Sequence, residues 1–156
     1  DEEIAGVVTV VKPDFLQLHG QETPARVGAI KSRFGIPVIK AVSIAEAADF
    51  AKVSSYGDAA DMFLFDAKAP AGAARPGGHG AAFDWQLLRG RTFSRPWLLA
   101  GGLRPDNVAR AIKVSGAMAV DVSSGVEEQP GVKSPELIRA FVDAVRTAEY
   151  ASEAES

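Results

Sequence analysis

The sequence predicts an α/β protein in which helices cover a parallel β-sheet. After one initial helix, short apolar segments alternate with amphipathic segments about five times along the chain. The apolar segments carry few polar residues on either face, which is typical of strands buried between helices. With 156 residues, of which 47% are hydrophobic and 24% charged, the chain is long enough to form one globular domain with a core.

The first expected elements are a helix and one strand–helix unit. Apolar residues recur within residues 3–12 at the spacing of one helix face, and Pro13 ends this pattern. Residues 15–20 then form a mostly apolar run that is typical of a strand. We expect Thr23 to cap the next helix, because its hydroxyl can accept a hydrogen bond from an N–H group of the first turn. Gly35 is expected to end that helix.

Two further units follow the same plan. A strand is predicted over residues 36–42, and Ser43 and Glu46 have the spacing of a capping box at the start of an alanine-rich helix. That helix is expected to reach about Ser54. The next strand, residues 61–66, is strongly apolar but ends on a carboxylate.

A long segment rich in glycine, alanine and proline covers residues 68–82. Loops of this length are uncommon between packed elements unless they cover a site. The segment is therefore either a lid over the end of the preceding strand or a surface excursion. Asp84 is expected to cap a short helix over residues 85–88.

The last two strands are predicted over residues 96–99 and 117–122. Arg104 stands at the expected start of the helix between them, where a short side chain with an oxygen atom is usual. Residues 1–148 are expected to form a single domain, and residues 149–156 a disordered tail.

Composition and charge exclude several classes of function. The net charge of -3, the pI of about 5.4 and the scattered Lys and Arg residues argue against a nucleic-acid partner. The chain has no run of about twenty apolar residues and starts with acidic residues, so we expect no membrane segment, no secretory signal and a cytoplasmic location. The lack of cysteine excludes disulfides and thiol nucleophiles from these residues. Because His19 and His79 are the only histidines and lie far apart in sequence, we expect no metal site.

Two turns rich in small residues follow neighbouring strands near the end of the chain. The first contains Gly101 and Gly102, and the second contains Ser123, Ser124 and Gly125. Small residues let backbone N–H groups approach an anion closely, and the start of a following helix adds free N–H donors. In (β/α)8 barrels a phosphate is often held by the loops after the last two strands. We therefore expect this pair of turns to bind one phosphate group.

Active sites of parallel α/β proteins gather at the carboxyl ends of strands. Asp66 is the candidate general acid or base, because an apolar strand and a long loop flank it; the alternative is an ion-paired or capping aspartate. Asp121 is expected to line the site, unless it only forms a turn. His19 either lines the site or is a structural histidine at its mouth. An inward Lys40 either contributes or pairs with one of these carboxylates.

Six motifs between Phe15 and about Ala148 occur in order and at suitable spacing. They are Leu16-Gln17-Leu18-His19-Gly20, Ile39-Lys40-Ala41, Leu64-Phe65-Asp66-Ala67-Lys68, the glycine cluster before Phe83-Asp84-Trp85, Leu99-Ala100-Gly101-Gly102-Leu103, and Asp121-Val122-Ser123-Ser124-Gly125-Val126-Glu127. Together they resemble the phosphoribosylanthranilate isomerases of tryptophan biosynthesis. The resemblance implies a (β/α)8 TIM barrel, here an incomplete one of about five strand–helix units preceded by a helix.

The resemblance also implies a reaction and a set of roles. The family converts N-(5-phosphoribosyl)anthranilate into 1-(2-carboxyphenylamino)-1-deoxyribulose 5-phosphate by an Amadori rearrangement, without a cofactor. By resemblance, Asp66 would be the general acid that protonates the furanose ring oxygen. His19 and Asp121 would line the substrate, and the two small-residue turns would hold its phosphate.

The catalytic base of the family, a cysteine in a Lys-x-Cys-Gly motif, has no counterpart in this sequence. We therefore expect the chain to be the C-terminal part of a longer isomerase and to be inactive by itself, because an acid without its base cannot complete the proton transfers. Open sheet edges would favour self-association. One alternative is a non-catalytic half-barrel that binds sugar phosphates. Another is indole-glycerol-phosphate synthase, whose lysine-rich catalytic apparatus is not evident.

Overall fold

Four parallel strands form the main sheet of the computed structural model, which describes residues 1–67 and 84–154. The strands lie in the order β1-β2-β3-β4. They are β1 (Leu16–Leu18), β2 (Val38–Ile44), β3 (Met62–Ala67) and β4 (Trp97–Leu99). The parallel α/β fold expected from the sequence is thus confirmed. Segment 68–82, expected to be a lid or a surface loop, lies outside the described residues, as does His79 within it.

The fifth expected strand, residues 117–122, is reduced to one parallel bridge between Leu99 and Val120. The Leu99 N–H donates to the Ala119 carbonyl (3.0 Å), and the Asp121 N–H donates to the Leu99 carbonyl (2.8 Å). The segment therefore still continues the sheet beside β4. Because β4 has only three residues, it can form few backbone hydrogen bonds with this neighbouring segment.

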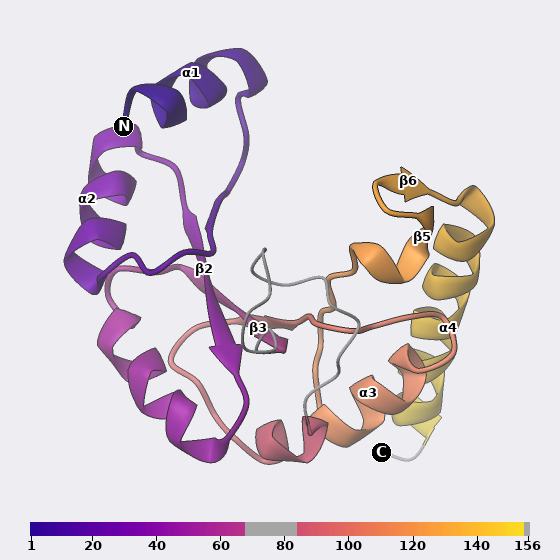
Figure 1. Cartoon of the computed structure of the whole chain (residues 1–156). Coiled ribbons are helices and arrows are strands. Elements are labelled where there is room, and N and C mark those ends of the chain that lie inside the picture. Colours follow the sequence, from indigo (N-terminus) through magenta and orange to yellow (C-terminus); the bar gives the residue numbers. More distant parts are fainter. Residues whose placement is uncertain (68–83, 155–156) are drawn as a thin grey trace.

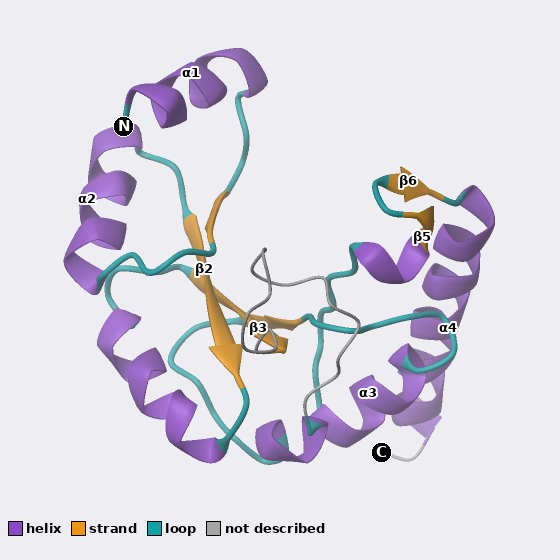
Figure 2. Cartoon of the chain, viewed as in Figure 1, coloured by secondary structure: helices purple, strands orange, loops and turns teal. Residues whose placement is uncertain are grey.

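Helices lie around an arc, with the main-sheet strands on its inner side (Figure 1). Figure 2 shows the same division by type of secondary structure. The helices are α1 (Glu2–Val11), α2 (Pro24–Phe34), η1 (Ala47–Tyr56), η2 (Trp85–Leu88), α3 (Val108–Ser115) and α4 (Pro135–Ala154), where η marks a 3-10 helix. Helix α4 extends past Glu149, where the sequence predicts the tail to begin. None of the described helices is long and apolar enough to span a bilayer.

Both ends of α2 follow the predicted caps. The Thr23 hydroxyl accepts a hydrogen bond from the Arg26 N–H (3.2 Å), and Gly35 ends the helix with a φ of 64°. The predicted cap of α3 is wrong, because Asn107 and not Arg104 precedes its first residue. The Asn107 side-chain oxygen accepts from the Arg104 N–H (2.8 Å), so a short oxygen-bearing side chain does stand at the start of this helix.

The capping box predicted at Ser43 is also wrong, because Ser43 belongs to β2. The start of η1 is held by Asp49 instead. Its carboxylate accepts hydrogen bonds from the N–H groups of Ala45 (2.9 Å) and Glu46 (3.2 Å). Asp84 begins η2 as predicted, since its carboxylate accepts from the Gln86 N–H (3.0 Å).

An antiparallel hairpin that the sequence analysis did not predict follows the second small-residue turn. It consists of β5 (Glu127–Gln129) and β6 (Val132–Lys133) and lies between the short helix η3 (Ser124–Val126) and α4. The hairpin brings the end of β6 back toward Ser123. This return places a lysine beside the candidate phosphate turn.

The main core lies between the sheet and the helices. Phe63 and Phe65 of β3 are fully buried. The Phe65 ring lies 4.7 Å from the Phe93 ring and 5.5 Å from the Trp97 ring, measured between centroids. Burying an aromatic or aliphatic side chain of this kind contributes about 1.5–3 kcal/mol. This packing fixes β3 against its neighbours and so fixes the residue that follows Phe65.

The register of the sheet decides which side each strand residue faces. Paired residues of neighbouring strands point to one face, and successive residues alternate. Val42 pairs with Phe65, and both pack in the core on the helix side. The next pair, Ser43 with Asp66, therefore faces the opposite side of the sheet, which we call the inner side.

Candidate functional site

Three neighbouring segments of the sheet end at one edge. The Ala100 N–H donates to the Phe65 carbonyl (2.8 Å), and the Asp121 N–H donates to the Leu99 carbonyl (2.8 Å). Asp66, Ala100 and Asp121 therefore stand at the same level of three adjacent segments. The residue before each of the two carboxylates packs against the core, so both carboxylates face the inner side.

The first small-residue turn has a backbone that requires glycine. Gly101 and Gly102 follow β4 after Ala100 and have φ values of 85° and 65°. Residues with a Cβ rarely adopt such left-handed conformations, and two in succession are rarer still. The turn that follows β4 therefore needs glycine at both of these positions.

The second small-residue turn lies directly against the first. A Cβ placed on Gly125 would stand 1.7 Å from the carbonyl oxygen of Leu103 and 3.1 Å from Cγ of Arg104. Only a glycine permits so close an approach of two backbones. The structure therefore brings together the two turns that the sequence analysis assigned to one phosphate.

Asn107 fastens the first turn. Its side-chain oxygen accepts from the Arg104 N–H (2.8 Å), and its side-chain nitrogen donates to the Gly102 carbonyl (2.9 Å). The sequence analysis missed this residue. A local signal was available, because an Asn one residue before an amphipathic helix commonly bonds nearby backbone groups.

Lys133 of β6 fastens the second turn. Its ammonium donates to the Ser123 carbonyl (2.8 Å), to the Ser123 hydroxyl (3.3 Å) and to the Glu127 carboxylate (2.7 Å). Hydrogen bonds from Lys133 and from the Gly131 N–H hold the pKa of Glu127 below its usual value. Sequence reasoning missed Lys133 as well, since it lies ten residues from Ser123 with no motif to connect them.

The two candidate carboxylates have different surroundings. The Asp66 side chain is half-buried at the end of β3. Asp121 is an exposed residue, yet the protein around its carboxyl group desolvates it and so raises its pKa. The attraction of the Lys133 charge acts in the opposite direction. The surroundings of Asp121 on the inner side therefore disfavour the ionised form of its carboxyl group.

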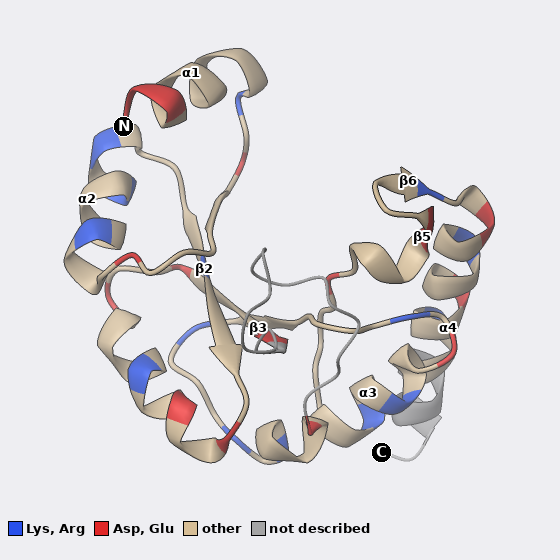
Figure 3. Cartoon of the chain, in the orientation of Figure 1, with Lys and Arg blue, Asp and Glu red and all other residues tan. Residues whose placement is uncertain are grey.

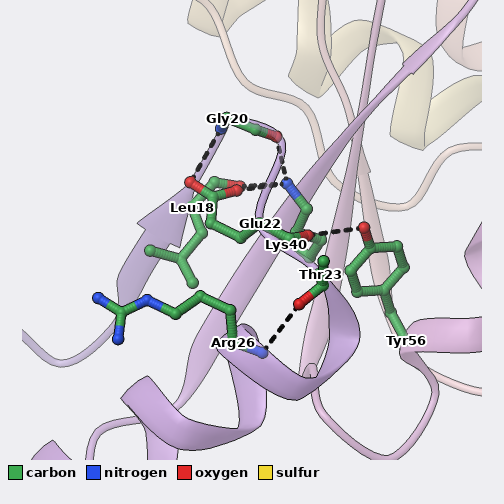
Figure 4. Close-up of polar contacts among 7 residues, drawn as sticks. All are labelled: Leu18, Gly20, Glu22, Thr23, Arg26, Lys40 and Tyr56. Atoms are coloured by element: carbon green, nitrogen blue, oxygen red, sulfur yellow. Dashed lines mark hydrogen bonds and ion pairs between the residues drawn. The ribbon is translucent and has the colours of Figure 1, made fainter.

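His19 and Lys40 are placed differently from each other. His19 lies exposed in the loop after β1. Lys40 pairs in register with the core residue Phe63, so it faces the helix side and not the inner side. Its carboxylate partner is Glu22, at 2.9 Å, and not Asp66 or Asp121 (Figure 4). The interpretation of Lys40 as an inward lysine is therefore wrong.

Outside this edge, the charged residues that the structure describes are spread over several elements. Figure 3 shows Lys and Arg distributed over α2, η1, α3 and α4, next to acidic residues. Among the residues that the structure describes, no three His, Cys, Asp or Glu side chains are grouped so that they could hold a metal ion. The described chemistry of the inner edge thus consists of two carboxylates and the backbone donors of two adjoining turns.

Comparison with known proteins identifies the family of this chain. The family model for N-(5'-phosphoribosyl)anthranilate (PRA) isomerase matches residues 1–144. The N-(5'-phosphoribosyl)anthranilate isomerase of Rhodospirillum rubrum is 57% identical over 146 residues, which cover 94% of this chain and 67% of that protein. The enzyme of the same name from Rhodopseudomonas palustris (strain BisB5) is 54% identical over 149 residues, which cover 96% of this chain and 68% of that protein. The chain thus spans about two thirds of the length of these relatives.

Solved structures give the same result for the fold. The crystal structure of phosphoribosyl anthranilate isomerase from Thermotoga maritima matches with a TM-score of 0.80 and 36% identity, over 94% of this chain and 68% of that one. A phosphoribosyl anthranilate isomerase in complex with reduced 1-(o-carboxyphenylamino)-1-deoxyribulose 5-phosphate matches with a TM-score of 0.74 and 35% identity, over 94% of this chain and 66% of that one. The four-stranded sheet and its helices therefore correspond to part of a (β/α)8 barrel.

Proposed function

Because the chain belongs to the N-(5'-phosphoribosyl)anthranilate isomerase family, we propose that it supplies the general acid and the phosphate site for that isomerisation in tryptophan biosynthesis. The observation that carries the proposal is the contact of two small-residue turns beside the strand that ends on Asp66. By the family resemblance, this reaction would need no cofactor. Each part of the proposal rests on particular groups of the inner edge.

The phosphate of the substrate would lie between the two turns. Gly101 and Gly102 on one side, and Ser123, Ser124 and Gly125 on the other, offer backbone N–H groups with little side-chain bulk. Donors arranged in this way bind a dianion without the entropy cost of ordering long side chains. Asn107 and Lys133 support the site by fixing the two backbones.

Asp66 would act as the general acid. Its proton goes to the furanose ring oxygen, the bond between this oxygen and C1′ breaks, and the anilino nitrogen lone pair forms a C=N bond, giving a Schiff base. A base then removes the C2′ proton, and the resulting enolamine tautomerises to the ketone product. A positioned acid of this kind contributes about 10²–10⁴-fold to the rate. The position of Asp66, one segment from the first turn and on the inner side, supports this role.

Asp121 and His19 would line the substrate on either side of Asp66. Asp121 follows the segment beside β4, and His19 follows β1 at the other end of the sheet. This separation suits a substrate that carries a sugar phosphate and an aromatic ring. We assign both residues to substrate binding, with residues 1–148 as one barrel domain.

The base that completes the reaction would come from residues other than these. The chain contains no cysteine, and the family resemblance assigns the base to a cysteine. We therefore propose that the 156 residues alone bind the substrate but do not turn it over. A chimeric chain, in which the part of the Rhodospirillum rubrum relative that these residues do not cover is joined to them, would supply the missing groups.

Turnover tests the proposal directly. Isomerisation of N-(5-phosphoribosyl)anthranilate is followed by the loss of its anthranilate fluorescence. We expect turnover by the chimera and none by the 156-residue chain. A folded chimera without turnover would overturn the isomerase assignment, and turnover by the 156 residues alone would overturn the need for an additional base.

A second candidate function is a self-associating module that binds sugar phosphates without chemistry. Two observations favour it: β1 is an edge strand of the described sheet, and Val10 and Val11 of α1 are 83% and 64% exposed. Strand edges and apolar helix faces of this kind pair readily with other chains. Sedimentation analysis tests this candidate: a defined dimer that binds inorganic phosphate supports the module, and a monomer opposes it.

A further inference from the structure

Lys40 is a buried cation outside the inner edge. It is 2% exposed and faces the helix side of β2. Removing an ammonium group from water is costly unless hydrogen bonds and an opposite charge replace its hydration. A lysine in this place therefore requires a specific set of partners, and those partners lie in one loop.

The ammonium of Lys40 holds the backbone on both sides of His19. It donates to the carbonyl of Leu18 (3.3 Å), to the carbonyl of Gly20 (2.9 Å) and to the carboxylate of Glu22 (2.9 Å). These three contacts use the three donors of the ammonium group. Leu18 and Gly20 are the residues immediately before and after His19, so the peptide that carries His19 is fixed at both ends.

Glu22 forms hydrogen bonds both within this loop and to Tyr56. One of its carboxylate oxygens accepts from the Gly20 N–H (3.1 Å), and its backbone carbonyl accepts from the Tyr56 hydroxyl (2.8 Å). The Tyr56 ring also lies 5.8 Å from the Lys40 ammonium. Burial is the largest single influence and raises the pKa of Glu22, but the hydrogen bond from Lys40, the backbone hydrogen bonds and the attraction of the Lys40 charge together outweigh it. The pKa of Glu22 is therefore lowered, which favours the charged carboxylate. Figure 4 shows these contacts converging on the loop after β1.

We propose that Lys40 is a positioning residue, which through Glu22 and Tyr56 fixes the loop that presents His19 to the substrate. The inference rests on the proposed function, since it assigns a purpose to the place of His19. Lys40 does not contact the ligand, because it faces the opposite side of the sheet. Its contribution is to hold the peptide of His19 in one conformation before the substrate arrives, which lowers the entropy cost of binding.

The chain contains a second lysine–carboxylate pair that serves as a control for this test. Lys31 of α2 pairs with Asp61 at 2.7 Å, and the same carboxylate accepts from the Val38 N–H (2.9 Å). This second lysine–carboxylate pair joins α2 to the amino ends of β2 and β3, and its lysine side chain is more exposed, at 34% against 3% for Lys40. Lys31→Met therefore removes a lysine–carboxylate pair of this sheet far from the loop of His19.

Binding and hydrogen exchange test the proposal in the 156-residue chain. Two probes are titrated by calorimetry. One is reduced 1-(o-carboxyphenylamino)-1-deoxyribulose 5-phosphate, which we call the reduced product analogue, and the other is inorganic phosphate. We expect Lys40→Met to raise the Kd of the analogue about tenfold and to leave the Kd of inorganic phosphate unchanged, because the two phosphate turns are on other strands. Lys31→Met should change neither Kd by more than about twofold. The Gly20 amide should exchange faster in Lys40→Met and at the wild-type rate in Lys31→Met.

Tyr56→Phe provides a milder variant should Lys40→Met not fold. It removes one hydrogen bond to Glu22 and should raise the Kd of the analogue about threefold. Equal analogue binding by wild type, Tyr56→Phe and Lys40→Met would overturn the inference, as would an equal loss in Lys31→Met. Failure of the wild-type chain to bind the analogue would instead overturn the proposed function, and the exchange rate of the Gly20 amide would still decide whether Lys40 fixes the loop.

Discussion

The backbone of Gly125 lies so close to Leu103 that a Cβ on residue 125 would stand 1.7 Å from the Leu103 carbonyl oxygen. These two residues belong to turns that are separated by about twenty residues in the sequence. Their contact joins the ends of two neighbouring sheet segments into one surface of backbone groups. The proposed phosphate site depends on this contact.

Replacing Gly125 by alanine is therefore expected to separate the two turns. The added methyl group collides with backbone atoms, which cannot rotate away as a flexible side chain could. We expect Gly125→Ala to lower the melting temperature and to raise the Kd of inorganic phosphate at least about tenfold. Gly116→Ala is the control, because Gly116 has a φ of 75° but no atom within 4 Å of its added Cβ. This control should lose about 1 kcal/mol of stability and keep its phosphate affinity; equal phosphate affinity in both variants would count against the joined site.

Asp66→Asn is expected to abolish isomerisation in the chimeric chain. An amide cannot deliver the proton that opens the furanose ring, so the rate should fall at least about 10²–10⁴-fold. Binding of the reduced product analogue should persist, because the phosphate turns are unchanged. Asp143→Asn, at an exposed position of α4, is the matched control. Turnover of Asp66→Asn near the wild-type rate would remove the acid role from this residue.

Asp121→Asn is expected to improve stability at neutral pH and to weaken binding. Desolvation raises the pKa of Asp121, with Lys133 acting in the opposite direction, so the folded state disfavours the ionised carboxylate. The wild type is therefore penalised above the raised pKa and gains stability relative to Asp121→Asn as the pH falls through it. Chemical denaturation between pH 3 and pH 7 measures this difference. An analogue Kd that Asp121→Asn leaves unchanged would contradict the substrate-binding role.

Asp49 should show the opposite dependence on pH. A hydrogen bond from the Ala45 N–H is the main cause of its lowered pKa, and burial opposes it. A lowered carboxyl pKa stabilises the fold above the unfolded value of 3.8, and this contribution is lost as the pH falls toward the folded pKa. Asp49→Asn should therefore unfold at lower denaturant than the wild type at pH 7, with the difference shrinking below about pH 4. A difference that grows on acidification would contradict this assignment.

Local signals in the sequence predicted those parts of the fold that local chemistry controls. Thr23 and Gly35 bound α2 as expected, since caps act over three or four residues. The side of the sheet that Lys40 faces could not be predicted in this way. Apart from Lys40 itself, strand 36–42 is apolar on both faces, so it lacks the alternation that would distinguish one side from the other.

The sequence predicted the main residues of the candidate site but not the residues that support them. Strand ends in a parallel sheet meet at one edge, so the sequence alone indicated that Asp66, Asp121 and the two turns lie together. Glu22 and Lys133 act through contacts across 18 and 10 residues of sequence. Such pairs depend on the tertiary fold, and no motif in one sequence reveals them.

A crystal structure of the 156-residue chain with the reduced product analogue tests the central claim most directly. We predict that the phosphate lies about 2.7–3.2 Å from backbone N–H groups of both small-residue turns, with the Asp66 carboxyl facing the sugar. A phosphate held by one turn alone, or a sugar on the helix side of the sheet away from Asp66, would contradict the account.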